Sequence, residues 1–365
     1  MYKITISIIA ELIVFFFLGC SSGEKTYTEE IINGVRVVHN NAPLWGDEKK
    51  ISLEFVQKIG ELESEDENYL LYYPIDITRD NEGFLYILDK DGRNIKKYTA
   101  DGEYVAAFGG EGQGPGEFEM PYFIEVANNG DIWISDASGR MQVLSPEGKY
   151  KREIRLKPGS TSFALFENGN ILNSNLSFDM QEDFTIVKIL NKDGELINEF
   201  GEPVRYNDIV NNFSGNNNKF FVDSRENVII VYSYREDIEK YSAEGELIFR
   251  IIRDLNYNLE IKEVTDDRGR TRTRFTSISR NAGVDHKDRI WDLIWKRQLE
   301  EGEEFDRDNL DKYWEFNIYS REGILLTKLP PPGHLFDTIQ HIGDRLYFID
   351  PHKDACIYEY RIVEK

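Results

Sequence analysis

One eight-residue pattern occurs five times along the 365-residue chain. It begins with an apolar residue, has a second apolar or aromatic residue three positions later, and ends in an acidic residue followed by glycine. The copies are IKKYTADG at 95–102, MQVLSPEG at 141–148, VKILNKDG at 187–194, IEKYSAEG at 238–245 and FNIYSREG at 316–323. An acidic residue and a glycine between apolar runs favour a tight turn between two strands. The glycines are 46, 46, 51 and 78 residues apart, and a strand-built period of about 45–50 residues is typical of β-propeller blades.

A second recurring element predicts the number of blades. Six strongly apolar runs follow polar or glycine-containing turns, as buried strands do. They lie at 81–89, 129–136, 168–175, 226–233, 288–295 and 344–350. After the sixth run the chain offers one more strand, at 356–362, so the last blade is one strand short. We expect the strand-like segment 52–60 to complete that blade and close the ring. The sequence thus predicts an all-β, six-bladed propeller over 51–365, with four-stranded antiparallel blades closed by an N-terminal strand.

The net charge limits the choice of partners. The chain has 66 acidic and 44 basic residues, which gives a formal net charge of −22. Such a surface repels phosphate backbones, so we expect no nucleic-acid partner. We interpret the acidity as a property that favours solubility.

The N-terminus resembles the signal peptide of bacterial lipoproteins. A positive start is followed by a mostly apolar stretch from Ile4 to Leu18, which is too short to span a bilayer, and then by the lipobox-like FLGC. The resemblance implies that residues 1–19 are removed and that Cys20 is acylated. It also implies that 20–50 is a polar tether and that the protein is anchored to the outer membrane, on its periplasmic or its surface face. We expect the other cysteine, Cys356, to be an inert buried thiol.

Part of the repeat region resembles a known family. The segments GGEGQGPGEFEMP (109–121), FIEVANNGDIWISD (123–136) and GRMQVLSPEGK (139–149) resemble the NHL repeat of six-bladed propellers. Together with the lipobox, they make the chain similar to six-bladed propeller lipoproteins of Gram-negative bacteria, related in fold to NHL and TolB-like propellers. Related propellers include protein-binding, sugar-binding and metal-dependent hydrolytic members, so the resemblance implies the fold more strongly than the function.

The resemblance also raises the question of an axial metal. Related lactonase-like propellers hold calcium at the axis with carboxylate and amide oxygens from the innermost strands. The innermost strands predicted here are 73–78, 123–127, 163–167, 220–223, 281–285 and 338–342. They offer as candidate metal ligands Asp76, Glu125, Asp223, Asn281 and Asp285. His341 lies on the last of these strands.

The longest interval between turn glycines predicts two insertions, near 254–276 and 296–313. The first has the pattern of a hairpin, and its return strand carries an arginine at every second position: Arg268, Arg270, Arg272 and Arg274. On an extended strand all four share one face. That face suits carboxylates, sulfated or uronic sugars, or an acidic protein. The alternative is a solvated face whose arginines pair with neighbouring acids. The second insertion is strongly charged, which is typical of a surface excursion.

Two functions therefore stay open at the level of sequence. The preferred one is a membrane-anchored propeller of the cell envelope that binds a protein or carbohydrate, with no catalytic residue assigned. The alternative is a propeller hydrolase or lactonase with an axial divalent cation such as calcium.

Overall fold

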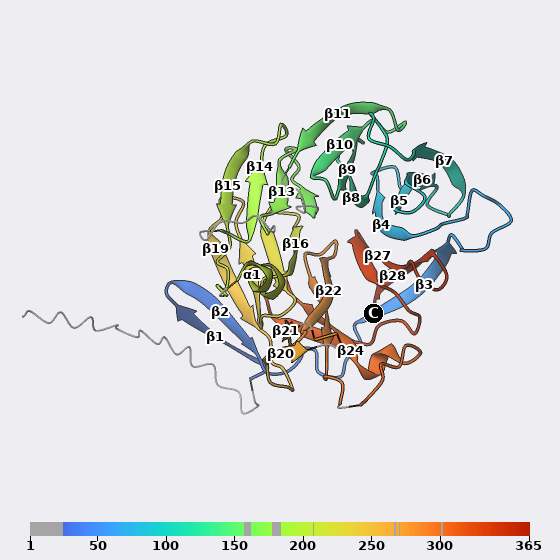
Figure 1. Ribbon diagram of the computed structural model, residues 1–365. Helices are drawn as coiled ribbons and strands as arrows, with labels where there is room; N and C mark the ends of the chain where they lie inside the picture. Colours follow the sequence, from blue (N-terminus) through green and yellow to red (C-terminus); the bar gives the residue numbers. More distant parts are fainter. Residues whose placement is uncertain are drawn as a thin grey trace, which may run out of the picture.

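A ring of β-sheets surrounds a central axis in this computed structural model of the chain (Figure 1). The structure describes residues 25–156, 162–176, 184–206, 208–265, 268–269, 271–300 and 302–365. Within each blade the four strands pair antiparallel, and the innermost strands of successive blades contact one another around the axis. The predicted six-bladed propeller with four-stranded blades is confirmed.

Each blade runs from an innermost strand at the axis to an outermost strand at the rim. Blade one consists of β4 (Pro74–Arg79), β5 (Leu85–Asp89), β6 (Asn94–Tyr98) and β7 (Tyr104–Gly109). Blade two consists of β8 (Pro121–Val126), β9 (Ile132–Asp136), β10 (Arg140–Leu144) and β11 (Tyr150–Arg155). Blade three consists of β12 (Phe163–Leu165), β13 (Ile171–Ser174), β14 (Val187–Leu190) and β15 (Leu196–Phe200). Blade four consists of β16 (Asn218–Val222), β17 (Val228–Tyr232), β18 (Asp237–Tyr241) and β19 (Leu247–Ile252). Blade five consists of β22 (Ser279–Val284), β23 (Ile290–Trp295), β24 (Trp314–Tyr319) and β25 (Leu325–Leu329). Blade six consists of β26 (Thr338–Ile342), β27 (Arg345–Asp350), β28 (Cys356–Glu364) and β3 (Ile51–Ile59).

The ring is closed between the two ends of the propeller sequence. Strand β3 pairs antiparallel with β28, from Ile51 opposite Glu364 to Ile59 opposite Ile357. The side chains of Ile51 and Ile59, at the two ends of β3, are buried. The sixth blade therefore takes its outermost strand from the N-terminal side of blade one, as the incomplete last repeat predicted.

The repeated glycines seat each blade on the one before it. All five have positive φ, as the tight turns require. An added Cβ on Gly148 would lie 2.1 Å from Cδ1 of Phe108, in the outermost strand of the preceding blade. Every other turn glycine faces the same strand of its own preceding blade. In chain order, the five glycines face Gln57 with Ile59, Phe108, Ile154, Phe200, and Phe249 with Ile251. The glycine thus serves the contact between blades as well as the turn.

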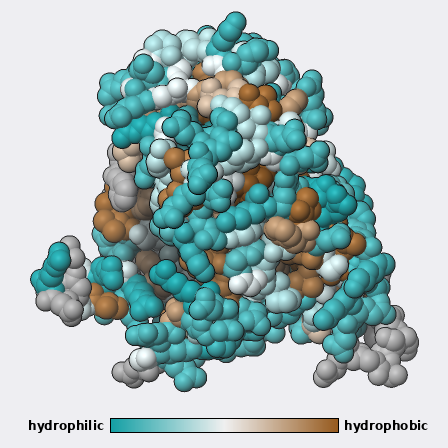
Figure 2. Space-filling model, turned by 90° about the vertical axis from the view of Figure 1, so that its right-hand side faces the viewer, coloured by the Kyte–Doolittle hydropathy of each residue, from teal (hydrophilic) through white to brown (hydrophobic). Residues whose placement is uncertain are grey.

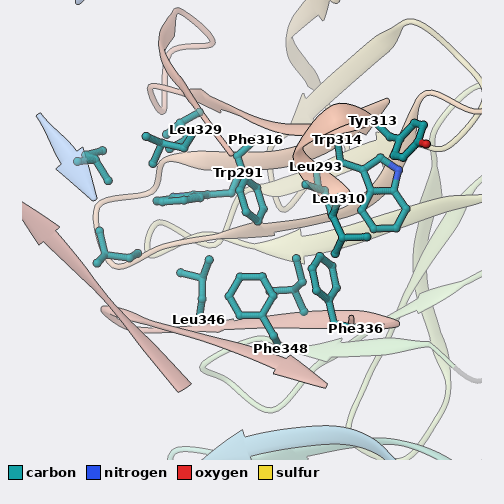
Figure 3. Packing of buried hydrophobic residues seen from close by; sticks show 14 residues of the cluster. Trp291, Leu293, Leu310, Tyr313, Trp314, Phe316, Leu329, Phe336, Leu346 and Phe348 are labelled. Atoms are coloured by element: carbon teal, nitrogen blue, oxygen red, sulfur yellow. The ribbon is translucent and has the colours of Figure 1, made fainter. Parts of the chain in front are cut away.

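Aromatic and branched side chains fill the space between neighbouring blades. Between blades five and six, Trp291, Phe316 and Phe348 are fully buried and meet edge to face, with ring centroids 5.5 and 6.3 Å apart along the series (Figure 3). Each strand contributes side chains to the packing on both sides of its blade, because successive side chains point to opposite faces of a sheet. The outer surface seen in Figure 2 is largely hydrophilic, with small separate hydrophobic patches.

The polar tether predicted for 20–50 is wrong over part of its length. Strands β1 (Tyr27–Ile32) and β2 (Val35–Asn40) form a hairpin, and β2 pairs parallel with β19, which extends blade four to six strands. Three valines in β2 supply β propensity, and Val37 and Val38 are buried against the blade. Charged residues in the first strand obscured this pattern. Residues 1–24, including the signal peptide and Cys20, lie outside the described residues.

The segment after this hairpin follows the rim of the ring. The backbone N–H groups of Leu44 and Trp45 donate to the carbonyl groups of Leu325 and Leu326 in blade five, at 2.8 and 3.1 Å. The chain then enters β3 in blade six. Residues 25–59 thus contact blades four, five and six in turn.

Both insertions lie in the fourth and longest interval between turn glycines, from Gly245 to Gly323. Strands β20 (Ile261–Thr265) and β21 (Thr271–Phe275) form a separate hairpin between blades four and five. The segment 296–313 joins β23 to β24, and its described residues include the short 3-10 helix η1 (Leu310–Lys312). A seven-residue helix, α1 (Ile209–Gly215), lies between blades three and four.

We predict that closure depends on the buried ends of β3. Ile59→Ala removes a buried side chain from the core between blades six and one, so we expect unfolding free energy to fall by about 2–4 kcal/mol. Val56→Ala, on the same strand but 37% exposed, is the matched control and should cost less than about 1 kcal/mol. Urea unfolding of both variants measures the difference, and equal losses would show that β3 does not hold the ring.

Candidate functional site

The chain direction places both insertions on one face of the disc. In a four-stranded antiparallel blade, the turn between the first and second strands and the turn between the third and fourth strands lie on one face of the propeller. The connection between the second and third strands and the link to the next blade lie on the other face. The β20–β21 hairpin is such a link, and 296–313 is such a middle connection. We call their face the insertion face and the opposite one, which carries the repeated glycines, the turn face.

A groove of about 810 Å³ opens between these two insertions. Its wall contains four aromatic side chains: Tyr234, Tyr257, Phe275 and Trp295. The remaining lining residues are mostly polar or charged: Ser214, Asn258, Glu260, Lys262, Val264, Arg272, Thr273, Arg274, Thr276, Ser277, Gln298 and Leu299. The groove therefore combines apolar rings with hydrogen-bonding groups, as small-molecule sites commonly do.

The aromatic wall is held from both sides. Phe275 is 9% exposed and packs against the rings of Tyr206 and Tyr234, at centroid distances of 5.2 and 5.5 Å. Trp295 packs edge to face against Trp314 at 5.5 Å. Burial raises the pKa of Tyr257 to about 12, so its hydroxyl stays a neutral donor at physiological pH. The aromatic contacts of Phe275 and Trp295 hold the wall of the groove in place without a ligand.

Cations line the hairpin side of the groove. In the β20–β21 register Lys262 lies opposite Arg274, and Val264 lies opposite Arg272, so the four share one face of the hairpin. Lys262 pairs with Glu260. Arg272 and Arg274 are exposed, and within the part of the chain that the structure describes neither side chain forms an ion pair or hydrogen bond. Their positive charge is thus left for solvent or a ligand.

The predicted four-arginine ladder is wrong in its extent. Strand β21 begins at Thr271, so Arg272 and Arg274 lie on it, whereas Arg268 lies in the turn. Arg270 lies outside the described residues. The partner strand contributes a third cation, Lys262, that the sequence analysis missed. Placing the turn at Gly269 would have paired Lys262 with Arg274.

A second cavity, of about 470 Å³, lies between the innermost strands at the axis. Asp76 on β4 is 2% exposed and accepts three hydrogen bonds. They come from the backbone N–H of Ile77 and Ile124, both at 2.9 Å, and from Nε2 of Gln340 at 2.5 Å. Because these donors belong to blades one, two and six, Asp76 joins three neighbouring blades.

Glu125 plays a similar part between blades two and three. Both of its carboxylate oxygens lie 3.1 Å from the backbone N–H of Leu165 on β12. Burial raises the pKa of Asp76 to about 7 and that of Glu125 to about 8, although the N–H donors act in the opposite direction. Thr78 adds another such link, accepting from the N–H of Val126 at 3.3 Å. Side chains thus accept hydrogen bonds from N–H groups on the inner edges of β8 and β12.

Two further titratable groups line this cavity. Burial lowers the pKa of Lys219 on β16, against the nearby charge of Asp76. Burial also lowers the pKa of His341 to about 4, so its ring is neutral. That ring lies against Gly283 of the neighbouring blade, where an added Cβ would be 2.0 Å from Nδ1. His341 therefore packs between blades five and six.

The axial metal set predicted from the sequence does not assemble. Asp76, Glu125 and Asn281 line the cavity, but Asp223 and Asp285 lie one residue beyond their strands. Asp223 pairs with Lys240 at 2.7 Å, and Asp285 pairs with Arg289 at 2.6 Å. Among the described residues, no group of three or more His, Cys, Asp or Glu side chains is placed to hold a metal. Calcium takes six to eight oxygen ligands, so these donors do not fit it.

The fold is shared with known proteins. A family model described as a six-bladed β-propeller, DUF5128, matches residues 47–279. The chain belongs to this family. Among curated proteins, none matches the chain.

Solved structures similar to this DUF5128 propeller are distant in sequence. A DUF4221 family member from Bacteroides vulgatus is 8% identical with a TM-score of 0.56, over 87% of this chain and 99% of its own. A candidate exported protein from Bacteroides fragilis is 13% identical with a TM-score of 0.56, over 90% and 98%. A candidate gluconolactonase is 10% identical with a TM-score of 0.50, over 86% and 93%. At these identities the likeness shows the fold alone.

We predict that the Glu125 carboxyl makes the DUF5128 propeller less stable as pH rises. The pKa of Glu125 is about 4.5 ordinarily and about 8 in the fold, so the folded state is penalised progressively between these pH values. Glu125→Gln keeps an acceptor for Leu165 and removes this penalty. We expect equal stability at pH 4 and a gain of about 1 kcal/mol or more at pH 8.5.

Chemical denaturation of wild type and variant at these two pH values measures the effect. Glu103→Gln, at an exposed position in a turn between strands, is the matched control. A Glu125→Gln stability difference that does not change with pH would contradict the prediction.

Proposed function

We propose that this chain is a lipid-anchored propeller of the cell envelope that binds an acidic carbohydrate in the insertion-face groove. One observation carries the proposal: two exposed arginines without a partner among the described residues face a groove whose wall contains four aromatic rings. Guanidinium groups bind carboxylates and sulfates through paired hydrogen bonds. Aromatic rings supply flat apolar contact area beside them.

The charge of the whole protein supports an anionic ligand at this place. With a net charge of −22, most of the surface repels anions. Lys262 is paired with Glu260, but Arg272 and Arg274 beside it provide positive charge that attracts an anion to the groove. This difference in charge favours binding of an anionic ligand at the groove over its adsorption to the rest of the surface.

The size of the groove favours a carbohydrate over a folded protein. Its volume of about 810 Å³ lies within the range of roughly 300–1,000 Å³ found for small-molecule sites. A stable protein interface instead needs roughly 800 Å² of surface from each partner. We therefore propose uronic or sulfated sugar units as the ligand, and a protein is the alternative outcome of the test.

The anchor is proposed from the sequence of the N-terminus. The lipobox-like FLGC supports acylation of Cys20 and attachment to the outer membrane. No helix in the part of the chain that the structure describes is long and apolar enough to cross a membrane. Acylation would thus attach the propeller to the membrane through residues upstream of the β1–β2 hairpin.

The groove makes a prediction about salt. The double substitution Arg272→Ser with Arg274→Ser should weaken binding of an oligogalacturonate by about tenfold or more at low salt, because two charge-assisted contacts are lost. The dependence of affinity on salt should also decrease. Since both side chains are exposed, thermal stability should stay nearly unchanged. Calorimetric titration at two salt concentrations measures these effects.

A matched control removes the same charge elsewhere. Lys192 and Arg225 are exposed in turns of the turn face, and replacing both with Ser should leave binding unchanged. Equal weakening by both double variants would mean that only net charge matters. Capture of an acidic protein with no oligogalacturonate binding would replace carbohydrate by protein as the ligand.

The anchor makes a separate prediction. Cys20→Ala should abolish incorporation of a labelled fatty acid, because acylation needs this thiol. Cys356→Ala is the matched control and should keep full labelling, since Cys356 is completely buried in β28. Metabolic labelling followed by fractionation of membranes tests both variants, and undiminished labelling of Cys20→Ala would refute the lipoprotein proposal.

A further inference from the structure

We propose that the axial cavity is a second binding site, which takes a small carboxylate and holds it through Lys219. This site is separate from the groove, since none of the residues that line one cavity lines the other. The proposal rests on how charge is distributed among the residues at the axis.

The acidic groups of the cavity already have partners. Both oxygens of Asp76 accept hydrogen bonds from neighbouring strands, and both oxygens of Glu125 face the N–H of Leu165. These contacts join neighbouring blades, and the hydrogen bonds to Asp76 engage both of its oxygens. The carboxyl groups at the axis are therefore structural.

The cations of the cavity lack such partners. Lys219 on β16 and Arg79 at the end of β4 both line it. Across the described ranges, neither side chain forms a hydrogen bond or an ion pair. Lys219 is partly buried, and burial lowers the pKa of its ammonium group although the nearby charge of Asp76 acts in the opposite direction. A bound anion would supply the missing partner.

The two cations define a path along the axis. Arg79 lies near the turn face, because its guanidinium is 3.2 Å from where a Cβ on Gly83 would be, in the first turn of blade one. Lys219 is the second residue of β16 and interacts electrostatically with Asp76 deeper in the cavity. A carboxylate entering from the turn face would meet Arg79 first and Lys219 afterwards.

The walls indicate a small polar ligand. The cavity of about 470 Å³ is at the lower end of small-molecule sites. Asn218, Asn281 and Gln340 line it together with Thr78, so hydroxyl groups on the ligand would find amide and hydroxyl partners. A monosaccharide acid combines the required size, carboxylate and hydroxyl groups.

The test compares two sugars of the same size that differ in charge. D-glucuronate and D-glucose are titrated into the purified full-length chain in detergent, by calorimetry. We expect saturable binding of glucuronate, at least about tenfold tighter than glucose. Lys219→Gln should lose about tenfold or more of that affinity, because a charge-assisted contact is removed. The double substitution Arg272→Ser with Arg274→Ser should remove only binding in the groove and leave the Lys219-dependent binding of glucuronate in place, which separates the two sites.

A second measurement does not depend on the folding of a variant. Reductive ¹³C-methylation of the lysines of wild type keeps their charge, and the resonance of Lys219 should shift on adding glucuronate but not glucose. No saturable glucuronate binding, equal affinity for the two sugars, or undiminished binding by Lys219→Gln would each overturn the proposal. Loss of glucuronate binding in the arginine variant alone would instead place the carboxylate in the groove.

Discussion

The contact between a turn glycine and the outermost strand of the preceding blade is the constraint on which the architecture depends. At four of the five turn glycines an added Cβ would lie less than 3.0 Å from a side chain of the preceding blade, and at Gly323 it would lie 3.0 Å away, so glycine allows the blades to stack this closely. This contact occupies the turn face around most of the ring. Long insertions are therefore accommodated on the insertion face, where the connections do not pack against the preceding blade in this way. The same constraint that repeats the blades also places the groove.

The axis presents a different physical problem. The inner edge of each innermost strand has no neighbouring strand in its own sheet, so its N–H groups need acceptors from elsewhere. Asp76, Thr78 and Glu125 accept these hydrogen bonds across blade boundaries. Polar side chains at the axis are thus needed for folding, which explains why acidic residues there do not by themselves indicate catalysis.

The sequence predicted the fold well because the decisive signals are local. The turn pattern, the apolar runs and the incomplete last repeat each lie within a few consecutive residues, and together they predicted the blades and the closing strand. The parallel pairing of β2 with β19 joins residues more than 200 positions apart, and no local pattern encodes such a pair.

The candidate site was predicted less well, for a geometric reason. Innermost strands were predicted at 220–223 and 281–285, whereas β16 and β22 begin two residues earlier and end one residue earlier. That small shift moves Asp223 and Asp285 from the axis into turns and brings Lys219 to the cavity. Ligand sets depend on single positions, so an error of one residue that leaves a fold prediction intact changes the chemistry of a site.

The N-terminal segment also has a mechanical consequence. If Cys20 carries the anchor, tension from the membrane enters the propeller at β1 and reaches β3 only after passing along blades four and five. Tension along parallel strands loads their hydrogen bonds together in shear, whereas tension at the end of an antiparallel pair opens them one at a time. The antiparallel β1–β2 hairpin would therefore open first, and the parallel β2–β19 ladder would then bear the load in shear and shield the strand that keeps the ring closed.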